Sequence, residues 1–307
     1  MHSFRIVAVL GFLVVSAAST SGQSANEAEP SSPKRLETVT VLGEPASLHD
    51  VSSESELVGP ANQPEWTTRR AFAETDIYVI PPGEFEFNQF YTWSQPRHGK
   101  PEHIFESEFE FGLPWRTQLD VEPNYRIEGG KLVYDSTRLE LPHALADWGK
   151  ILLNPAVDAG WRFNRGAQDS LLFRLLLAEE IGQRFHFGGN FGFEQQVGGE
   201  RETEYELNAA LSYVLMDRKV TVGLEFLAEF ESDQEREGQT TLLLGPTILF
   251  KPTKDTHLGL VTLAGLTEES PAAEVFLIFG IDLEMFRWAG LRSGTGREEI
   301  QPFRRGR

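Results

Sequence analysis

The sequence contains no cysteine, so neither a disulfide nor a lipid-modified N-terminal cysteine is available to it. It also lacks a long hydrophobic run. The longest, residues 6–18, is too short for a transmembrane helix and has the length of a signal-peptide core. Basic residues are few, 28 Lys and Arg against 46 Asp and Glu, and the formal net charge is −18. We therefore expect no nucleic acid partner.

The N-terminus has the order of a secretory signal: Arg5, then an apolar stretch, then small residues up to Gly22. We predict that residues 1–22 are a cleaved signal peptide. Residues 23–82 are rich in Ser, Glu, Pro and Ala at their start, a composition that buries too little apolar surface to offset its ordering entropy. We interpret 23–82 as a disordered periplasmic lead with one strand-forming stretch at 36–43.

From Glu84 onward, apolar and polar residues alternate with a period of two. In residues 184–194, for example, Phe185, Phe187, Phe191 and Phe193 fall on one face, opposite polar residues and glycines. The pattern recurs in segments of about ten residues, which predicts twelve strands at 84–93, 103–112, 117–128, 131–141, 151–164, 169–181, 184–195, 203–215, 219–231, 239–251, 256–266 and 272–286.

Twelve antiparallel strands of this length fit an all-β, up-and-down transmembrane β-barrel over residues 83–286, because an even number returns both termini to one side. Short and long connections alternate along the chain, as expected for periplasmic turns and outer loops, with two exceptions: a short outer connection at 129–130 and a long periplasmic one at 143–149. A secreted soluble β protein is the alternative. The apolar face is too bulky to fill one closed barrel, whereas lipid outside the barrel accepts any volume, and this favours the membrane.

Two stretches carry a resemblance to a known family: residues 74–86, with the sequence ETDIYVIPPGEFE, and residues 143–155, with the sequence HALADWGKILLNP. They resemble outer-membrane transporters grouped with meta-pathway phenol-degradation proteins. The likeness spans roughly residues 74–286, and its motifs are structural: a Pro-Pro-Gly turn before the first strand and a Trp-containing periplasmic turn. The resemblance implies a barrel in the cell outer membrane with a transport role.

A second resemblance is local. The five residues Glu37, Thr38, Val39, Thr40 and Val41 look like the energy-coupling box near the N-terminus of TonB-dependent receptors. Those receptors add a plug domain and a larger barrel, for which this chain has no room. The box implies a periplasmic energy-coupling protein as a partner. A chance alternation of β-branched residues in the lead is the other interpretation.

With lipid outside, the charged face lines the lumen, and its charges are unevenly spread. The predicted acidic lining residues are Glu84, Glu86, Glu106, Glu108, Glu110, Glu225 and Glu229; the predicted basic ones, on the third to sixth strands, are Arg126, Arg138, Arg162 and Arg174. Opposed walls of this kind could orient a dipolar solute in an open pore. The same residues could instead pair across a narrow lumen and close it.

We expect a porin or transporter for small polar or aromatic solutes. The alternative is an outer-membrane enzyme or a structural barrel with a plugged lumen. No nucleophile motif accompanies the barrel histidines, and His98 and His103 lack an acid or thiol cluster, so we predict no catalytic residue, cofactor or metal site. Besides lipid, the barrel-assembly machinery is an expected partner, and residues 287–307 form a basic tail.

Overall fold

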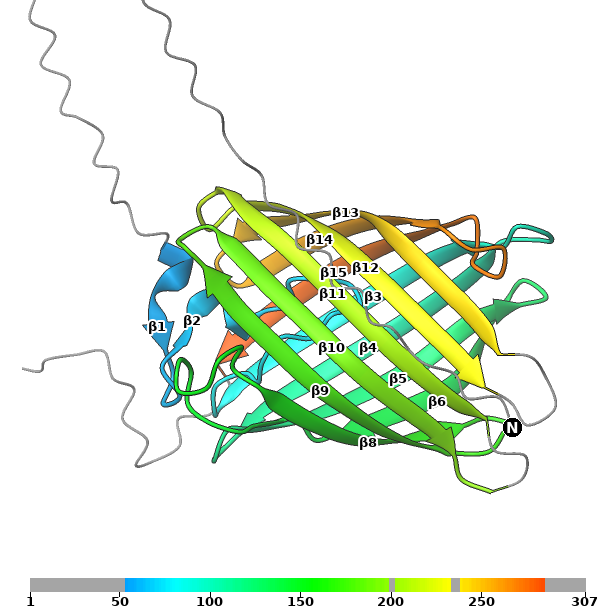
Figure 1. Cartoon of the computed structure of the whole chain (residues 1–307), viewed down its shortest axis with the longest axis horizontal. Coiled ribbons are helices and arrows are strands. Elements are labelled where there is room, and N and C mark those ends of the chain that lie inside the picture. The colour runs from blue at the N-terminus through cyan, green and yellow to red at the C-terminus, as the bar shows by residue number, and fades with distance from the viewer. Residues whose placement is uncertain (1–52, 199–201, 233–237, 285–307) are drawn as a thin grey trace, which may run out of the picture. The chain divides into compact units, whose positions relative to one another are not determined.

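The computed structural model describes residues 53–198, 202–232 and 238–284. Twelve long strands dominate it (Figure 1). They are β3 (Glu84–Gln95), β4 (Glu102–Leu113), β5 (Thr117–Glu128), β6 (Lys131–Glu140), β8 (Ala156–Asn164), β9 (Ser170–Ile181), β10 (Phe185–Gln196), β11 (Thr203–Met216), β12 (Val220–Ser232), β13 (Gln239–Thr253), β14 (Thr256–Gly265) and β15 (Ala273–Glu284).

The twelve strands form a closed antiparallel barrel, which confirms the predicted fold class. Each strand pairs with its neighbours in sequence, and β15 returns to pair with β3 over twelve residues. The two-residue strand β7 (His143–Ala144) bridges β5 and β8 at one rim. The fifth strand begins at Ala156 rather than at residue 151, because Leu153 and Asn154 have positive φ angles of 61° and 42° that end the extended backbone.

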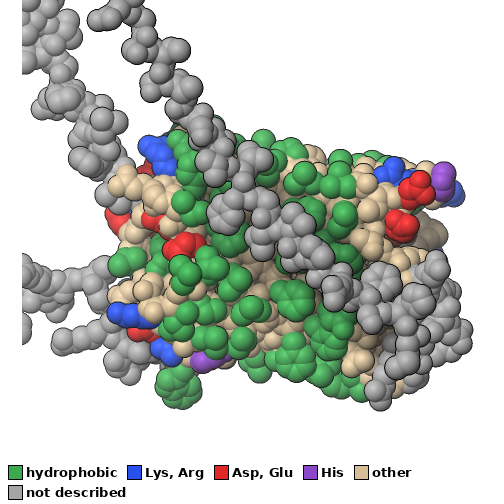
Figure 2. Space-filling view, in the orientation of Figure 1, with side chains coloured by type: hydrophobic (Ala, Val, Ile, Leu, Met, Phe, Trp, Pro, Cys, Tyr) green, Lys and Arg blue, Asp and Glu red, His purple; other side chains and the backbone are tan. Residues whose placement is uncertain are grey.

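The outer surface of the barrel is apolar across its middle. Large hydrophobic side chains such as Leu224, Phe191 and Leu277 are about half exposed on the outside, and polar side chains between them are buried inside. Figure 2 shows hydrophobic side chains over the middle of the visible face and charged ones toward the two ends. Closed hydrogen bonding and an apolar outer band are what a bilayer requires of a sheet, so the protein is an outer-membrane β-barrel.

Adjacent strands also pack aromatic rings on this outer face. Phe85 and Phe111, and next to them Phe87 and Phe109, face each other across β3 and β4 with ring centroids 5.1 Å apart. Such cross-strand pairs each stabilise a sheet by up to about 1 kcal/mol. Among the described residues, no helix is long and apolar enough to cross a membrane.

The two rims of the barrel differ. At one rim most connections are short, as at 217–219 and 254–255; at the other most are longer, as at 96–101 and 266–272. Two connections are exceptions, as the sequence predicted: residues 141–155, which contain β7, form a long one at the first rim, and residues 129–130 form a short one at the second. In outer-membrane barrels the short turns are periplasmic. We therefore call the first rim periplasmic. The small elements η1 (Ser53–Ser55), β1 (Leu57–Val58), β2 (Gln63–Pro64) and η2 (Glu65–Thr68) lie there (Figure 1).

Residues 53–80 differ from the expected disordered lead. Residues 53–68, which we call the cap, are fixed to the barrel by a buried ion pair between Glu54 and Lys251 of 2.9 Å and by Trp66, which stacks on His186. Residues 69–80, which we call the inward segment, enter the lumen. The composition of the lead changes at Trp66: from there on, aromatic and branched side chains supply enough apolar surface to offset the cost of ordering.

Other boundaries proposed from the sequence lie outside the described residues. These are the signal peptide at 1–22, the box at 37–41 and the tail at 287–307, and each stays a prediction.

Candidate functional site in the barrel lumen

The inward segment fills the lumen at its centre, and the carboxylate of Glu225 binds three of its consecutive backbone N–H groups. Glu225 on β12 is fully buried, and its two oxygens accept hydrogen bonds from the backbone N–H groups of Ala73, Glu74 and Thr75 at 2.9–3.0 Å. The Thr75 hydroxyl donates a fourth hydrogen bond at 3.0 Å. One side chain therefore satisfies three consecutive backbone donors, which would otherwise be buried without partners.

Two asparagines on neighbouring strands hold the next residues. Asn190 on β10 accepts a hydrogen bond from the backbone N–H of Asp76 and donates one to its carbonyl, at 2.8 and 2.7 Å, as a strand partner would. Asn208 on β11 donates to the carbonyl of Glu74 at 3.1 Å. The segment therefore pairs with side chains of the wall instead of with backbone, which leaves the barrel's own hydrogen bonds intact.

An ion-pair chain links the segment to β9, the neighbour of β10. The Asp76 carboxylate lies between Arg70 of the same segment and Arg174 of β9, the latter at 2.6 Å. Burial alone would raise the pKa of the Asp76 carboxyl, but Arg70, Arg174 and Arg138 together hold this pKa below its usual value. Asp76 is therefore ionised and bridges two cations in the lumen.

Arg70 anchors the start of the inward segment. Its guanidinium pairs with Glu108 at 3.3 Å and lies 5.2 Å from the ring centroid of Phe90, and its backbone N–H donates to Glu86 at 2.8 Å. A charged donor in a water-poor lumen is retained only where several acceptors and a ring face compensate for its lost hydration.

The predicted acidic residues divide into two groups. Five lie around the inward segment or on its periplasmic side, and all of them but Glu84 are buried; they are Glu84, Glu86, Glu108, Glu110 and Glu225. The other two, Glu106 and Glu229, line a cavity on the outer side of the segment. The structure thus places all seven on the inner face of the wall, in two different surroundings.

The predicted basic residues also differ from one another. Arg174 is nearly buried and pairs with Glu140 and Asp158 as well as Asp76. Arg138 pairs with Glu106, Glu122 and Glu140, and Arg162 with Glu194. Arg126 is half exposed near the outer rim, where it pairs with Glu128 and Asp135. All four arginines therefore have acidic partners, and their distribution runs from the centre of the lumen to the outer rim.

One side of the lumen is apolar, which the alternation of charges did not predict. Strands β3 and β12–β15 turn buried hydrophobic side chains inward against Ala73 of the segment; these are Phe90, Leu227, Leu243, Val261, Leu263, Phe276 and Ile278. In the sequence these residues stand singly among polar residues at the inward-facing positions of their strands, so they form no apolar run. Listing every second residue of each strand as inward-facing would have identified them.

The wall also makes room for the segment. Gly188 on β10 faces it so closely that a Cβ atom there would lie 3.0–3.2 Å from side-chain atoms of Phe72, Thr75 and Ile77. That contact is tighter than van der Waals packing comfortably allows. Glycine at a lumen-facing position of a strand is therefore a sequence signal of close approach, and here the approaching chain is the inward segment.

Between the inward segment and the outer rim, the lumen widens into a cavity of about 710 Å³. Its lining includes Glu74, at the tip of the segment. Acidic side chains from β11, β12 and β15, together with Phe90 and Phe276, lie on one side, and Arg126, Arg138 and Arg162 on the other. We call this the outer cavity. A second, smaller cavity of about 210 Å³ lies at the periplasmic rim. The inward segment lies between the two.

The two buried strand histidines, His186 and His257, form no hydrogen bond with a serine among the described residues. His186 lies opposite Ser212 in the register of β10 and β11, but no hydrogen bond joins their side chains, and the imidazole stacks on Trp66 with ring centroids 4.2 Å apart. His257 contacts Asn88 and two carboxylates. Neither of these two histidines is hydrogen-bonded to a serine, threonine or tyrosine hydroxyl among the described contacts. Two other histidines are, since Nδ1 of His143 lies 3.0 Å from the Thr117 hydroxyl and Nδ1 of His103 lies 2.8 Å from the Tyr91 hydroxyl.

The fold has known counterparts, although no protein-family model and no curated protein matches the sequence. An outer membrane channel from Pseudomonas putida F1 is similar, with 11% identity and a TM-score of 0.49 over 69% of this chain and 100% of that one. The NanC porin is 9% identical, with a TM-score of 0.48 over 64% of this chain and 98% of its own.

Outer-membrane expressed OmpT of Vibrio cholerae is 10% identical, with a TM-score of 0.37 over 67% of this chain and 100% of that one. At these identities the likeness concerns the fold alone. The resemblance to phenol-degradation proteins stays a prediction.

Proposed function

We propose that this protein is an outer-membrane channel for small polar or aromatic solutes, which its own inward segment closes from within. The observation that carries the proposal is the outer cavity, which opens at the outer rim and ends at the tip of the segment. Its charged and apolar walls can contact both the polar and the ring part of such a solute.

Passage beyond the outer cavity requires the inward segment to move. The segment is joined to the wall by hydrogen bonds and ion pairs to side chains, and these can be exchanged for water without breaking any strand pairing. Such exchangeable contacts favour a channel that can open over a barrel whose lumen is permanently filled. A structural barrel with a permanent plug is the second candidate, favoured by the same dense set of contacts.

Conductance of the purified protein in planar bilayers separates the two candidates. We expect low conductance for the unmodified protein and steady, higher conductance for a Glu225→Ala and Asn190→Ala double variant, in which the backbone N–H groups of residues 73–76 lose their acceptors. Glu229→Gln is the matched control: it also removes a lumen charge, but the described contacts of the segment do not include it. A silent barrel in all three proteins would exclude the channel and leave the structural role.

We further propose that a periplasmic energy-coupling protein releases the segment by acting on the box at residues 37–41, which eleven residues (42–52) separate from the cap. Deleting 37–41 should then abolish solute uptake by cells while leaving the bilayer conductance of the Glu225→Ala and Asn190→Ala variant unchanged. Normal uptake by the deletion variant would contradict this partner. The barrel-assembly machinery remains a proposed partner for insertion.

A further inference from the structure

The first and last strands of the barrel meet at a seam where two acids lie opposite each other. Glu86 of β3 and Asp282 of β15 are direct cross-strand partners. Both side chains point into the lumen, Glu86 fully buried and Asp282 mostly so. Like charges in directly opposite positions destabilise a sheet. The seam therefore needs positive charge between or beside these carboxylates.

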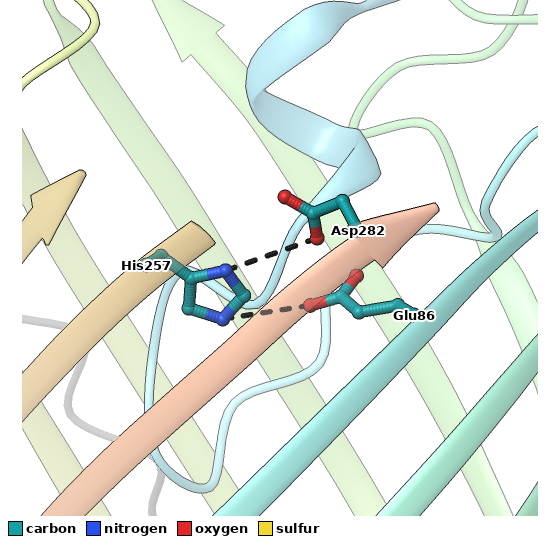
Figure 3. Close-up of side chains that lie close together, drawn as sticks. All are labelled: Glu86, His257 and Asp282. Carbon is teal, nitrogen blue, oxygen red and sulfur yellow. Dashed lines mark ion pairs between the residues drawn. The ribbon is translucent and has the colours of Figure 1, made fainter. Parts of the chain in front are cut away.

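A histidine from the neighbouring strand reaches into this seam. His257 of β14 is fully buried and lies opposite Gly280 of β15. A Cβ atom at Gly280 would lie 2.0 Å from the ring, so only glycine lets the imidazole cross β15. Figure 3 shows the ring between Glu86 and Asp282, with one nitrogen directed toward each.

The hydrogen bond to Asn88 identifies which nitrogen of His257 carries a proton. The amide nitrogen of Asn88 donates to Glu86 and Glu108, so its oxygen faces His257 Nε2 at 3.0 Å and accepts a hydrogen bond from it. In the neutral ring, Nδ1 then carries a lone pair. It has no hydrogen-bond partner among the described residues and lies 3.8 Å from Asp282 Oδ1.

A lone pair that faces a carboxylate oxygen inside a protein calls for a cation between them. One imidazole nitrogen and two carboxylate oxygens, one donor atom from each residue, lie within 4.8 Å of one another. Imidazole nitrogen and carboxylate oxygen are both ligands that zinc and related divalent ions accept, and three protein ligands are the number that zinc sites with an open position have.

We propose that Glu86, His257 and Asp282 bind one divalent transition-metal ion such as Zn²⁺, which ties β3, β14 and β15 together where the barrel closes. Other contacts of the two acids would orient them as ligands. Arg69 Nε lies 2.9 Å from the second oxygen of Asp282, and the backbone N–H of Arg70 donates to Glu86, so both acids are already oriented by the inward segment.

The site also has access to solvent. The cavity of about 210 Å³ at the periplasmic rim is lined by Glu86 and Asp282, so an ion can arrive from the periplasmic side. The other two acidic clusters among the described residues lack a histidine. In the first, formed by Asp120, Glu122 and Glu140, both glutamates already have arginine partners, and in the second Glu204, Glu206 and Glu229 are only partly buried. Metal binding at this seam requires no conduction through the lumen.

Metal titration of the full-length protein tests the site. Protein in detergent, stripped with a chelator and desalted, is titrated with Zn²⁺ by calorimetry and with Co²⁺ by visible absorption. We expect one tight site per chain, and His257→Gln and Asp282→Asn should each weaken binding at least about tenfold, because loss of outer-shell partners alone has that effect. The Co²⁺ spectrum of His257→Gln should also lose its tetrahedral band.

Two controls separate this site from other histidines. His186→Gln removes the other buried strand histidine, and His98→Gln with His103→Gln removes the pair at the outer rim; both should bind Zn²⁺ as the unmodified protein does. Folding is checked by the shift in gel mobility on heating, and if His257→Gln does not fold, Glu86→Gln replaces it. No saturable binding, or equal binding by the ligand variants, would overturn the proposal, as would stability that depends on His257 and pH but not on Zn²⁺.

Discussion

At the scale of single residues, the contribution of an arginine to the stability of the barrel depends on where in the lumen it lies. Arg174 has a side chain only 10% exposed and is shared by Asp76, Glu140 and Asp158, whereas Arg126 is 52% exposed. Arg174→Gln should lower the free energy of unfolding by about 3–5 kcal/mol, because it leaves buried carboxylates without a counter-charge. Urea titration of the protein in detergent micelles measures this.

The matched control is Arg126→Gln, which removes the same charge from a solvated pair and should cost about 1 kcal/mol or less. Equal losses for the two variants would contradict the distinction between a buried network at the centre and a screened pair at the rim. The pairs of Arg126 are also the ones that salt should weaken most.

At the scale of elements, each strand presents one side chain to lipid and the next to the lumen. Leu224, near the middle of β12, is 56% exposed on the outside. Leu224→Arg should cost about 2–4 kcal/mol and reduce the amount of folded barrel, because it places a charge at the depth of the apolar band. The folded fraction is measured by gel mobility with and without heating.

Thr92→Arg is the control on the inner face. Thr92 lines the outer cavity, close to Glu274 of β15, so an added guanidinium there has both space and an acidic neighbour. Its folded fraction should match that of the unmodified protein. Equal failure of both variants would show that the two faces of the strands are not as different as the exposures indicate.

At the scale of the whole molecule, charge in the outer cavity is unbalanced. Its three arginines have acidic partners, while six of its acids, Glu74, Glu102, Glu204, Glu206, Glu229 and Glu274, have no Lys or Arg within 4 Å among the described residues. An excess of carboxylates gives a negative potential, so cations should be favoured over anions at low salt, where screening is weakest.

Reversal potentials across a salt gradient measure this preference in the conducting Glu225→Ala and Asn190→Ala background. Adding Glu204→Gln, Glu206→Gln and Glu229→Gln should reduce the preference for cations, because glutamine keeps the size of each side chain and removes its charge. Leu277→Gln, a neutral change on the outer face, should have no effect. Selectivity that is unchanged by the triple variant would mean that ions do not pass these acids.

The strands could be predicted from the sequence because their signal is local. A period of two between apolar and polar residues follows from the pleat of a single strand in contact with lipid on one side, and twelve repeats of it with alternating loop lengths are enough to indicate the barrel. The charged residues of the wall were identifiable for the same reason. Their partners were not, because Arg174 has Asp76 and Glu140 as neighbours only after the barrel closes.

The sequence by itself therefore determined the architecture and the two faces of its wall. Only the tertiary structure decided what fills the lumen. The contacts between Glu225 and Thr75 join residues 150 apart, and the seam joins Glu86 to His257 and Asp282 from three strands. No periodicity encodes such contacts, since they depend on which inward side chains share a level once the first and last strands have paired.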